Sequence, residues 1–405
     1  MTDSYKFEGY KWEALSDAYP EHSAYRRWVQ SFFDNINWNA LCRFASELND
    51  GKDCAVDPQW TIGGRHLIRI INFQDGSRWI ARLRMTTRMS EDEQSGLVQR
   101  EVDCLQLVRE RTTVPVPTVF GYMASTRNEI GAPFILMDCL FGNIGPDLNG
   151  DIDQGVPSQH KSSFYAEMAI LQTETSSIMF PKIGAIIRLA DGTYDVGPLP
   201  GIGGPFSTAT EYLKAWAKAA EFPDFSQAKE ACGEYYDDVM SQIAEFPHKL
   251  EELAANIPMR DHGPFPLFHK DFGHNNIVVD DDYNVLGVID WEHACSVPWE
   301  CIYFPITLSL LPAPMDAPEN YDENGIAKGA DTRSMIEERT RYIGTVQEAE
   351  RSKGLSSWLS ATLADQGNQD LGYAMKLYTE DGKFGFYNKI LDVHHEKWSG
   401  GKKKS

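Results

Sequence analysis

One stretch of the sequence indicates the fold: Phe268-His-Lys-Asp-Phe-Gly-His-Asn-Asn-Ile-Val-Val-Asp-Asp-Asp-Tyr-Asn-Val-Leu-Gly-Val-Ile-Asp-Trp-Glu292. Residues 277–279 and 285–289 are β-prone runs, and the polar residues between them are typical of a turn. The pattern predicts a β-hairpin. Antiparallel pairing would bring Asn276, which precedes the first strand, beside Asp290, which follows the second.

A second carboxylate, Asp271, lies five residues before Asn276 on the loop that leads into the hairpin. Two carboxylates and an amide offer the oxygen ligands that Mg²⁺ prefers. Phosphoryl transfer needs one carboxylate to orient a hydroxyl nucleophile and accept its proton, and further oxygens to hold the metal that bridges the phosphates. We therefore expect Asp271 to act on the nucleophile and Asn276 and Asp290 to hold Mg²⁺. His269 would orient the loop by hydrogen bonds.

The spacing His269-x-Asp271-x-x-x-x-Asn276, followed by Ile-Asp-Trp-Glu at 289–292, resembles the aminoglycoside/choline phosphotransferase family over about residues 56–310. The resemblance implies an α+β, bilobal protein-kinase-like fold, with a small antiparallel β-sheet lobe and a larger, mostly helical lobe. It also implies ATP and Mg²⁺ as cofactors. The implied domains are a helical N-terminal extension, a small nucleotide-binding lobe and a helical catalytic and substrate lobe, at residues 1–55, 56–138 and 139–405.

The resemblance extends to the small lobe. Arg82 takes the place of the lysine that binds phosphate, and Glu101 fits the helix glutamate that pairs with it. Residues 134–140 fit the last strand and the hinge, whose backbone at Asp138, Cys139 and Leu140 would hold adenine. Arginine is bulkier and forked, so it is no simple substitute for lysine, although it can bind phosphate through two donors. The turn at 62–66 has two glycines rather than a GxGxxG, so a phosphate cradle and an ordinary tight turn both stay open.

Hydrophobic periodicity and turn residues predict the remaining elements. A helical segment at 22–48 should break near 35–39, and two strands at 66–73 and 78–85 should be joined by a turn at Asp75-Gly76. We expect further helices at 91–110, 158–177, 207–219 and 227–257, short strands at 114–120 and 133–138, and a mostly helical region at 300–400.

Composition narrows the function classes. The chain has 405 residues, with 38 Lys and Arg against 59 Asp and Glu, for a net charge of −21. This excess of acids argues against a general nucleic-acid or anionic-membrane binder but permits a cationic substrate. Seven scattered cysteines without a CxxC predict no disulfide framework and favour a reducing, cytoplasmic location. The polar N-terminus is not a signal peptide, and no apolar run is long enough to span a membrane.

Several residues in and near the motif have more than one interpretation. Glu292 could complete a local hydrogen-bond network or bind a cationic substrate, and Arg84 shares a strand face with Arg82 and could also meet phosphate. His274 could contact substrate, but we expect it to be a partly exposed loop residue, and we expect Trp291 to lie in the core rather than to stack on a ligand.

The leading hypothesis is an ATP- and Mg²⁺-dependent phosphotransferase that acts on a hydroxyl of a small molecule. Its acceptor would be recognised by loops at 142–157 and 195–206 and by the segment after Glu292. A second hypothesis is a catalytically weak relative with a binding or regulatory role, suggested by the arginine and the thin glycine turn. A third is a metal-dependent hydrolase with His269, Asp271, His274 and Asp290 as ligands.

Overall fold

The computed structural model describes residues 9–85, 89–149, 155–392 and 394, and the chain divides into two compact units. The first unit comprises Met1–Phe164, Ile187–Tyr194 and Phe272–Ala294, and the second comprises Tyr165–Ile186, Asp195–Asp271 and Cys295–Ser405. Each unit is therefore assembled from segments that are distant in the sequence. The domain boundaries predicted after residues 55 and 138 stay predictions.

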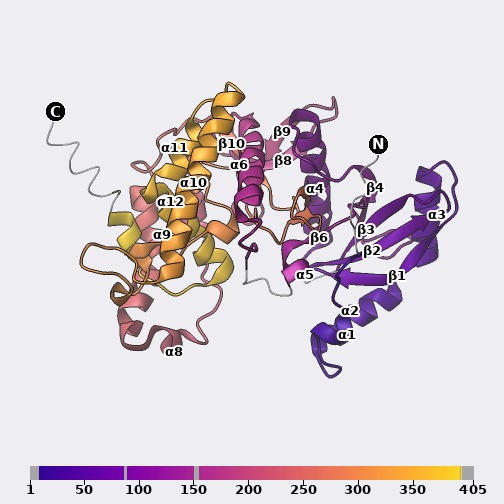
Figure 1. Ribbon diagram of the computed structural model, residues 1–405, viewed down its shortest axis with the longest axis horizontal. Helices are drawn as coiled ribbons and strands as arrows, with labels where there is room; N and C mark the ends of the chain where they lie inside the picture. Colours follow the sequence, from indigo (N-terminus) through magenta and orange to yellow (C-terminus); the bar gives the residue numbers. More distant parts are fainter. Residues whose placement is uncertain (1–8, 86–88, 150–154, 393, 395–405) are drawn as a thin grey trace. The chain divides into compact units, whose positions relative to one another are not determined.

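The first unit is built on a five-stranded antiparallel sheet with the order β1-β2-β3-β5-β4 (Figure 1). Its strands are β1 (Cys54–Ile62), β2 (His66–Phe73), β3 (Arg78–Arg84), β4 (Val119–Met123) and β5 (Phe134–Asp138). The predicted strands β2 and β3 are confirmed, and Gly76 in the turn between them has a φ of +86°. Strand β4 begins five residues later than predicted, because Pro115 and Pro117 have no N–H to donate to a ladder. The longest strand, β1, was not predicted.

Helices cover both faces of this sheet. Helices α2 (Ala24–Asn35) and α3 (Trp38–Leu48) share a hydrophobic cluster with Trp79, Ala81 and Leu83 of β3, whereas Ile80 packs with residues of α4 (Glu91–Arg111). Because side chains alternate along a strand, Arg82 and Arg84 lie on the same side as Ile80. The short α1 (Leu15–Ala18) precedes α2. The predicted break between α2 and α3 is confirmed, and the Asn37 side chain caps α3 by accepting from the Ala40 amide.

The hairpin predicted from the sequence is also confirmed. Strands β11 (Ile277–Val279) and β12 (Val285–Val288) pair in antiparallel fashion, and β6 (Asn143–Ile144) adds a third strand beside β11. The short helix α5 (Gly145–Asn149) follows β6 directly. All of these elements belong to the first unit.

The second unit is mostly helical. Its main helices are α6 (Lys161–Ser177), whose first turn belongs to the first unit, α7 (Ala209–Ala219), α8 (Ala228–Cys232), α9 (Tyr236–Leu253), α10 (Ala330–Ser352), α11 (Trp358–Ala364) and α12 (Gln366–Lys376). A sheet of short strands has the order β7-β10-β13-β8-β9, with bounds Met179–Phe180, Phe265–Phe268, Cys295–Ser296, Gly184–Arg188 and Tyr194–Gly197. The single helix predicted at 227–257 is interrupted after α8 because Gly233 adopts a positive φ of +53°.

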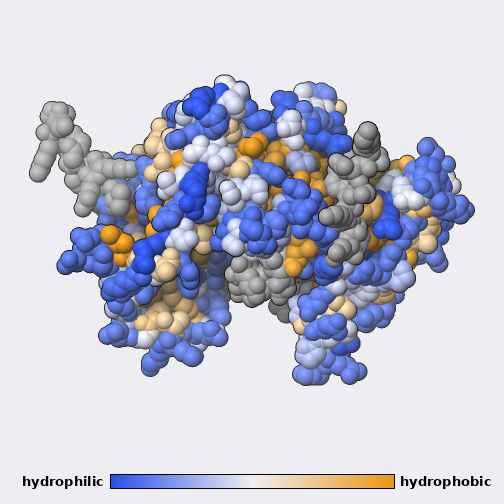
Figure 2. Space-filling view, in the orientation of Figure 1, coloured by the Kyte–Doolittle hydropathy of each residue, from blue (hydrophilic) through white to orange (hydrophobic). Residues whose placement is uncertain are grey.

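Short helical turns complete the second unit. They are the 3₁₀ turns Gly233–Tyr235, Trp299–Cys301, Ile306–Leu308, Ala313–Met315 and Pro318–Asn320 and a π turn at Leu377–Asp381. The face of the molecule in Figure 2 is mostly hydrophilic, and large exposed apolar side chains such as Phe141 and Met259 are scattered along the sequence. Among the described residues, no helix combines the length and apolarity needed to cross a lipid bilayer.

Candidate active site

The ends of the β11–β12 hairpin place Asn276 and Asp290 side by side. Ile277 pairs with Val288, and the Ile289 amide donates to the Asn276 carbonyl at 2.9 Å. Asp290 has a φ of +65°, a left-handed conformation that is uncommon for a residue other than glycine. Such strain persists only where the surrounding structure holds it, and it is concentrated at functional sites. The hairpin thus presents the two predicted metal ligands together.

Arg82 links Asp290 to helix α4, which covers the face of the sheet on which Arg82 lies. Its guanidinium donates to Asp290 Oδ1 at 2.6 Å and lies 3.4 Å from Glu101 Oε1, so one arginine bridges β3, α4 and the end of the hairpin. The predicted pairing of Arg82 with Glu101 is confirmed. Arg82 and Glu101 are 8% and 2% exposed, and burial raises the pKa of Glu101 to about 8. Burial alone would lower the pKa of Arg82, but the nearby acids raise it, so the guanidinium stays charged.

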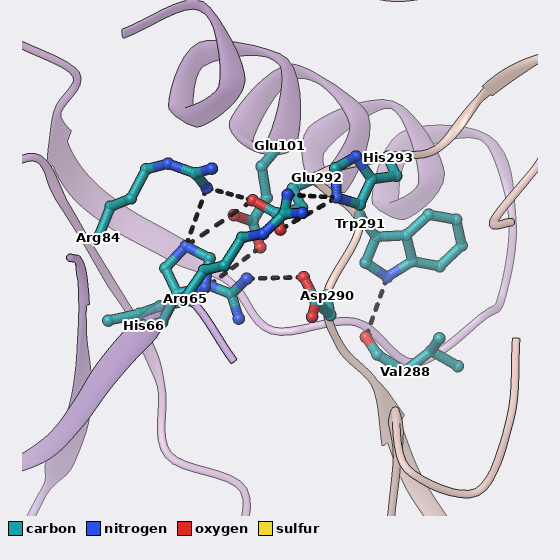
Figure 3. Close-up of polar contacts among 10 residues, drawn as sticks. Arg65, His66, Arg84, Glu101, Val288, Asp290, Trp291, Glu292 and His293 are labelled. Atoms are coloured by element: carbon teal, nitrogen blue, oxygen red, sulfur yellow. Dashed lines mark hydrogen bonds and ion pairs between the residues drawn. The ribbon is translucent and has the colours of Figure 1, made fainter. Parts of the chain in front are cut away.

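A second pair, Arg84 and Glu292, lies next to the first. Figure 3 shows Arg84 and His66 directed toward the Glu292 carboxylate, with Glu101 and Asp290 close by. Arg84 donates to Glu292 Oε2 and is 3.3 Å from His66 Nε2, and the His66 ring lies 3.8 Å from the same carboxylate oxygen. Burial and the Arg82 charge hold the pKa of His66 well below 6.5. Of the two interpretations of Glu292, the local network is the one that these contacts favour.

Three of these side chains could in principle ligate a metal. The nearest ligand atoms of His66, Glu101 and Glu292 lie within 4.8 Å of one another. However, guanidinium groups of Arg82 and Arg84 already contact both carboxylates, and a cation among them would meet two positive charges. The group is therefore better described as a buried ion-pair network than as a metal site.

The other predicted catalytic residues lie in the second unit, directly before the unit boundary at Asp271. His269 is 2% exposed and Asp271 is half-buried. Lys270 between them has a φ of +67°, and its carbonyl accepts a hydrogen bond from the buried Tyr303 hydroxyl. The chain is thus turned sharply at the position that presents Asp271.

Lys270 also lines a cavity of about 320 Å³ that lies wholly within the second unit. Aromatic side chains of Tyr212, Trp216 and Tyr303 form part of its wall. Three of its charged residues are ion-paired: Glu380 lies 3.6 Å from Lys270 Nζ and 3.1 Å from Lys376 Nζ. Two of the regions expected to recognise an acceptor, residues 195–206 and the segment after Glu292, contribute to this cavity.

Comparison with known proteins identifies the family. The phosphotransferase enzyme family (APH) matches residues 72–301, more than half of the chain. The chain belongs to this family.

Solved structures show that this phosphotransferase has the protein-kinase-like, bilobal α+β fold that the sequence predicted. A protein from Ralstonia eutropha JMP134, provisionally assigned as an aminoglycoside phosphotransferase, is 16% identical, with coverage of 88% of this chain and 99% of that chain and a TM-score of 0.50. An ethanolamine kinase from Plasmodium vivax is 9% identical, with coverage of 95% and 98% and a TM-score of 0.39. At 16% identity the likeness to the Ralstonia protein concerns the fold alone. A search of curated proteins found no match.

In this phosphotransferase, the predicted hinge carries contacts that the sequence did not reveal. Asp138 ends β5, and its carboxylate accepts from the Thr118 amide at 2.7 Å. The Tyr10 hydroxyl donates to the Leu140 carbonyl at 3.2 Å and lies 2.9 Å from Cys139 Sγ. The segment around Tyr10 therefore lies along the hinge, whereas the N-terminal extension was predicted only as helix. No local pattern marks a contact between residues 130 positions apart.

Two further expectations concern the glycine turn and His274. The Gly63 amide donates to the His66 carbonyl at 2.8 Å, so residues 63–66 form a tight turn between β1 and β2, and a role in cradling phosphate stays a prediction. His274 is 4% exposed, so its predicted partial exposure was wrong. The ring packs against Gly145, where an added Cβ would lie 2.5 Å from it. Trp291 is 1% exposed, as predicted.

Proposed function

We propose that this protein is an ATP- and Mg²⁺-dependent phosphotransferase that moves the γ-phosphate to a hydroxyl group of a small molecule. One observation carries the proposal: Asp290, whose backbone is left-handed, pairs through its carboxylate with Arg82, which also pairs with Glu101. A cation, a helix acid and a hairpin-end acid in contact are the parts that kinase-like phosphoryl transfer uses on the nucleotide side. Family membership independently supports the reaction class.

The residues at the hairpin ends fit a magnesium ion. Asn276 and Asp290 are hard oxygen donors at the neighbouring ends of the two hairpin strands, and the Asp290 side chain is 32% exposed, so a hydrated ion can reach it. We assign these two residues as the metal ligands. When bound, Mg²⁺ would neutralise charge on the phosphates. Arg82 would contact the phosphates, and the backbone of Asp138, Cys139 and Leu140 would receive the adenine base.

On the acceptor side, we assign Asp271 as the group that orients the hydroxyl and accepts its proton, with His269 as the residue that orients the loop. The cavity beside Lys270 would hold the acceptor, because the residue that precedes Asp271 lines it. The lining balances lysines against glutamates, so a cationic acceptor is one option among several. We retain residues 56–138 as the nucleotide-binding lobe and 139–405 as the catalytic and substrate lobe. A cytoplasmic location is part of this proposal, consistent with seven free cysteines.

The test begins with the nucleotide. ATP with Mg²⁺ should raise the melting temperature of the purified protein, since a ligand present at 100 times its Kd stabilises the folded state by about 2.7 kcal/mol. ATP consumption is then screened against a panel of hydroxyl-bearing metabolites, with Asp271→Asn as the blank. A cognate acceptor should lose about 10²–10⁴-fold of its turnover in that variant. Equal turnover by Asp271→Asn and the wild type would overturn the proposal.

A second candidate, a binding or regulatory protein with weak catalysis, is favoured by one contact. Strand β3 carries Arg82 rather than lysine, and the Arg82 guanidinium donates to the Asp290 carboxylate at 2.6 Å. This candidate predicts no stabilisation by ATP and Mg²⁺ at millimolar concentration and no turnover of any acceptor. The hydrolase hypothesis stays a prediction, to be tested by phosphoester hydrolysis in the absence of nucleotide.

A further inference from the structure

We propose that Glu292 is a positioning residue that holds the segment Asp290–His293 on strand β3 and so keeps Asp290 in place for the metal-bound nucleotide. This inference rests on the proposed function. Both oxygens of the Glu292 carboxylate are engaged: Oε2 accepts from Arg84, and Oε1 lies 3.2 Å from His293 Nε2 (Figure 3). Arg84 is 208 residues away in the sequence, so the pair joins two distant segments of the first unit.

The contacts form two ion pairs between the same two segments of the chain. Arg82 pairs with Asp290, and Arg84 pairs with Glu292, so the partners are spaced by two residues on both segments. Residues two apart on a strand point to the same side, which explains why β3 can offer both guanidinium groups at once. The Arg84–Glu292 pair is the more deeply buried: the Arg84 and Glu292 side chains are 1% and 5% exposed, whereas the Asp290 side chain is 32% exposed.

A bound cation would affect the Arg82–Asp290 and Arg84–Glu292 ion pairs differently. A metal held by Asp290 would compete with Arg82 for Oδ1 or be restricted to Oδ2, because Oδ1 accepts from Arg82. The Arg84–Glu292 ion pair does not compete with the metal for a carboxylate oxygen of Asp290. It therefore remains to hold a segment whose Asp290 has an unfavourable φ of +65° and would otherwise relax.

The experiment separates positioning from folding by removing both partners of the buried pair. Single variants leave an unpaired buried charge and lose much of their stability, whereas Arg84→Met/Glu292→Gln leaves no charge behind. Calorimetry then measures the Kd of ATP with and without Mg²⁺ for the wild type and the double variant. We expect the tightening that Mg²⁺ produces to fall about 10–100-fold, as for other residues that support metal ligands, while the Kd of metal-free ATP stays unchanged.

Two further variants complete the design. Glu292→Asp keeps the charge, and so the fold, but shortens the side chain by one methylene, and we expect a smaller loss in the same direction. Arg127→Ala removes an exposed ion pair with Glu91 in the same unit and should leave both Kd values unchanged. A double variant with wild-type Mg²⁺ tightening would overturn the inference while leaving the proposed function intact. A wild type that binds no ATP at all would overturn both.

Discussion

In the first unit, the buried carboxylate of Glu292 meets Arg84 and two histidines, whereas in the second unit the buried carboxylate of Asp370 accepts from the Gln366 amide at 2.6 Å. The effect on the two acids is opposite. Burial alone would raise the pKa of Glu292, but the hydrogen bond from His293 and the charges nearby hold it below its usual range. Burial raises the pKa of Asp370 to about 6. The partners of Glu292 thus keep its carboxylate charged, whereas the surroundings of Asp370 favour the neutral acid.

This contrast fits the division of labour in the proposed reaction. Phosphates and a divalent cation need full charges held in fixed positions, and buried ion pairs supply these at a considerable desolvation cost. In the proposed reaction, the acceptor would instead meet a cavity with aromatic walls and two lysines that both lie close to Glu380. The first unit would thus hold the nucleotide by charge, and the second would recognise the acceptor.

The largest expected effect comes from removing the arginine that bridges two acids. Arg82→Ala would leave Glu101 and Asp290 without their shared partner, and breaking a buried pair in this way costs about 3–5 kcal/mol. Urea denaturation of the purified protein measures the loss. Arg82→Lys keeps the charge but provides a single ammonium that cannot fork between two acids, so we expect an intermediate stability.

Arg43→Ala is the matched control, because Arg43 pairs with Glu129 on the surface of the same unit, with both side chains more than half exposed. A surface pair contributes little to stability. Should Arg82→Ala cost no more than Arg43→Ala, the ion-pair network would not be what organises the first unit, and the contrast between the units would fail.

The same contrast explains what the sequence could and could not predict. Strands β2 and β3, helix α4 and the hairpin follow from local periodicity and turn residues, and Arg82 with Glu101 followed from the family pattern. Arg84 with Glu292 and Tyr10 with Leu140 join positions 208 and 130 residues apart, and no local pattern encodes such contacts. The cavity is still harder to predict from the sequence, because the residues that line it are spread between positions 200 and 380.

An intermediate effect concerns pH and tests the second unit. The folded-state pKa of Asp370 is about 6 against 3.8 for an ordinary aspartate, so its contribution to stability is present below pH 3.8 and is lost as the pH rises through 6. Asp370→Asn stays neutral and keeps the oxygen that accepts from Gln366. Relative to the wild type, the variant should therefore gain up to about 3 kcal/mol between pH 4 and pH 7.

Urea denaturation across this pH range measures the gain, and Asp331→Asn, at an exposed position of α10, controls for the loss of a surface carboxylate. A stability difference that does not change with pH would mean that Asp370 is charged in the folded protein. Asp370 would then be a buried charge as Glu292 is.

The smallest expected effect concerns the turn at Lys270, which directly precedes the sequence boundary between the two units at Asp271. Tyr303→Phe removes the hydroxyl that donates to the Lys270 carbonyl and should cost about 1 kcal/mol of stability. Because the left-handed Lys270 precedes Asp271, we expect turnover of a cognate acceptor to fall while the KM for ATP stays unchanged. Tyr321→Phe is the control, since its hydroxyl donates to Asp316 in the same unit, outside the residues that line the cavity. If both variants keep wild-type turnover, the Tyr303 bond only stabilises the fold; if the KM for ATP rises instead, the turn at Lys270 serves the nucleotide rather than the acceptor.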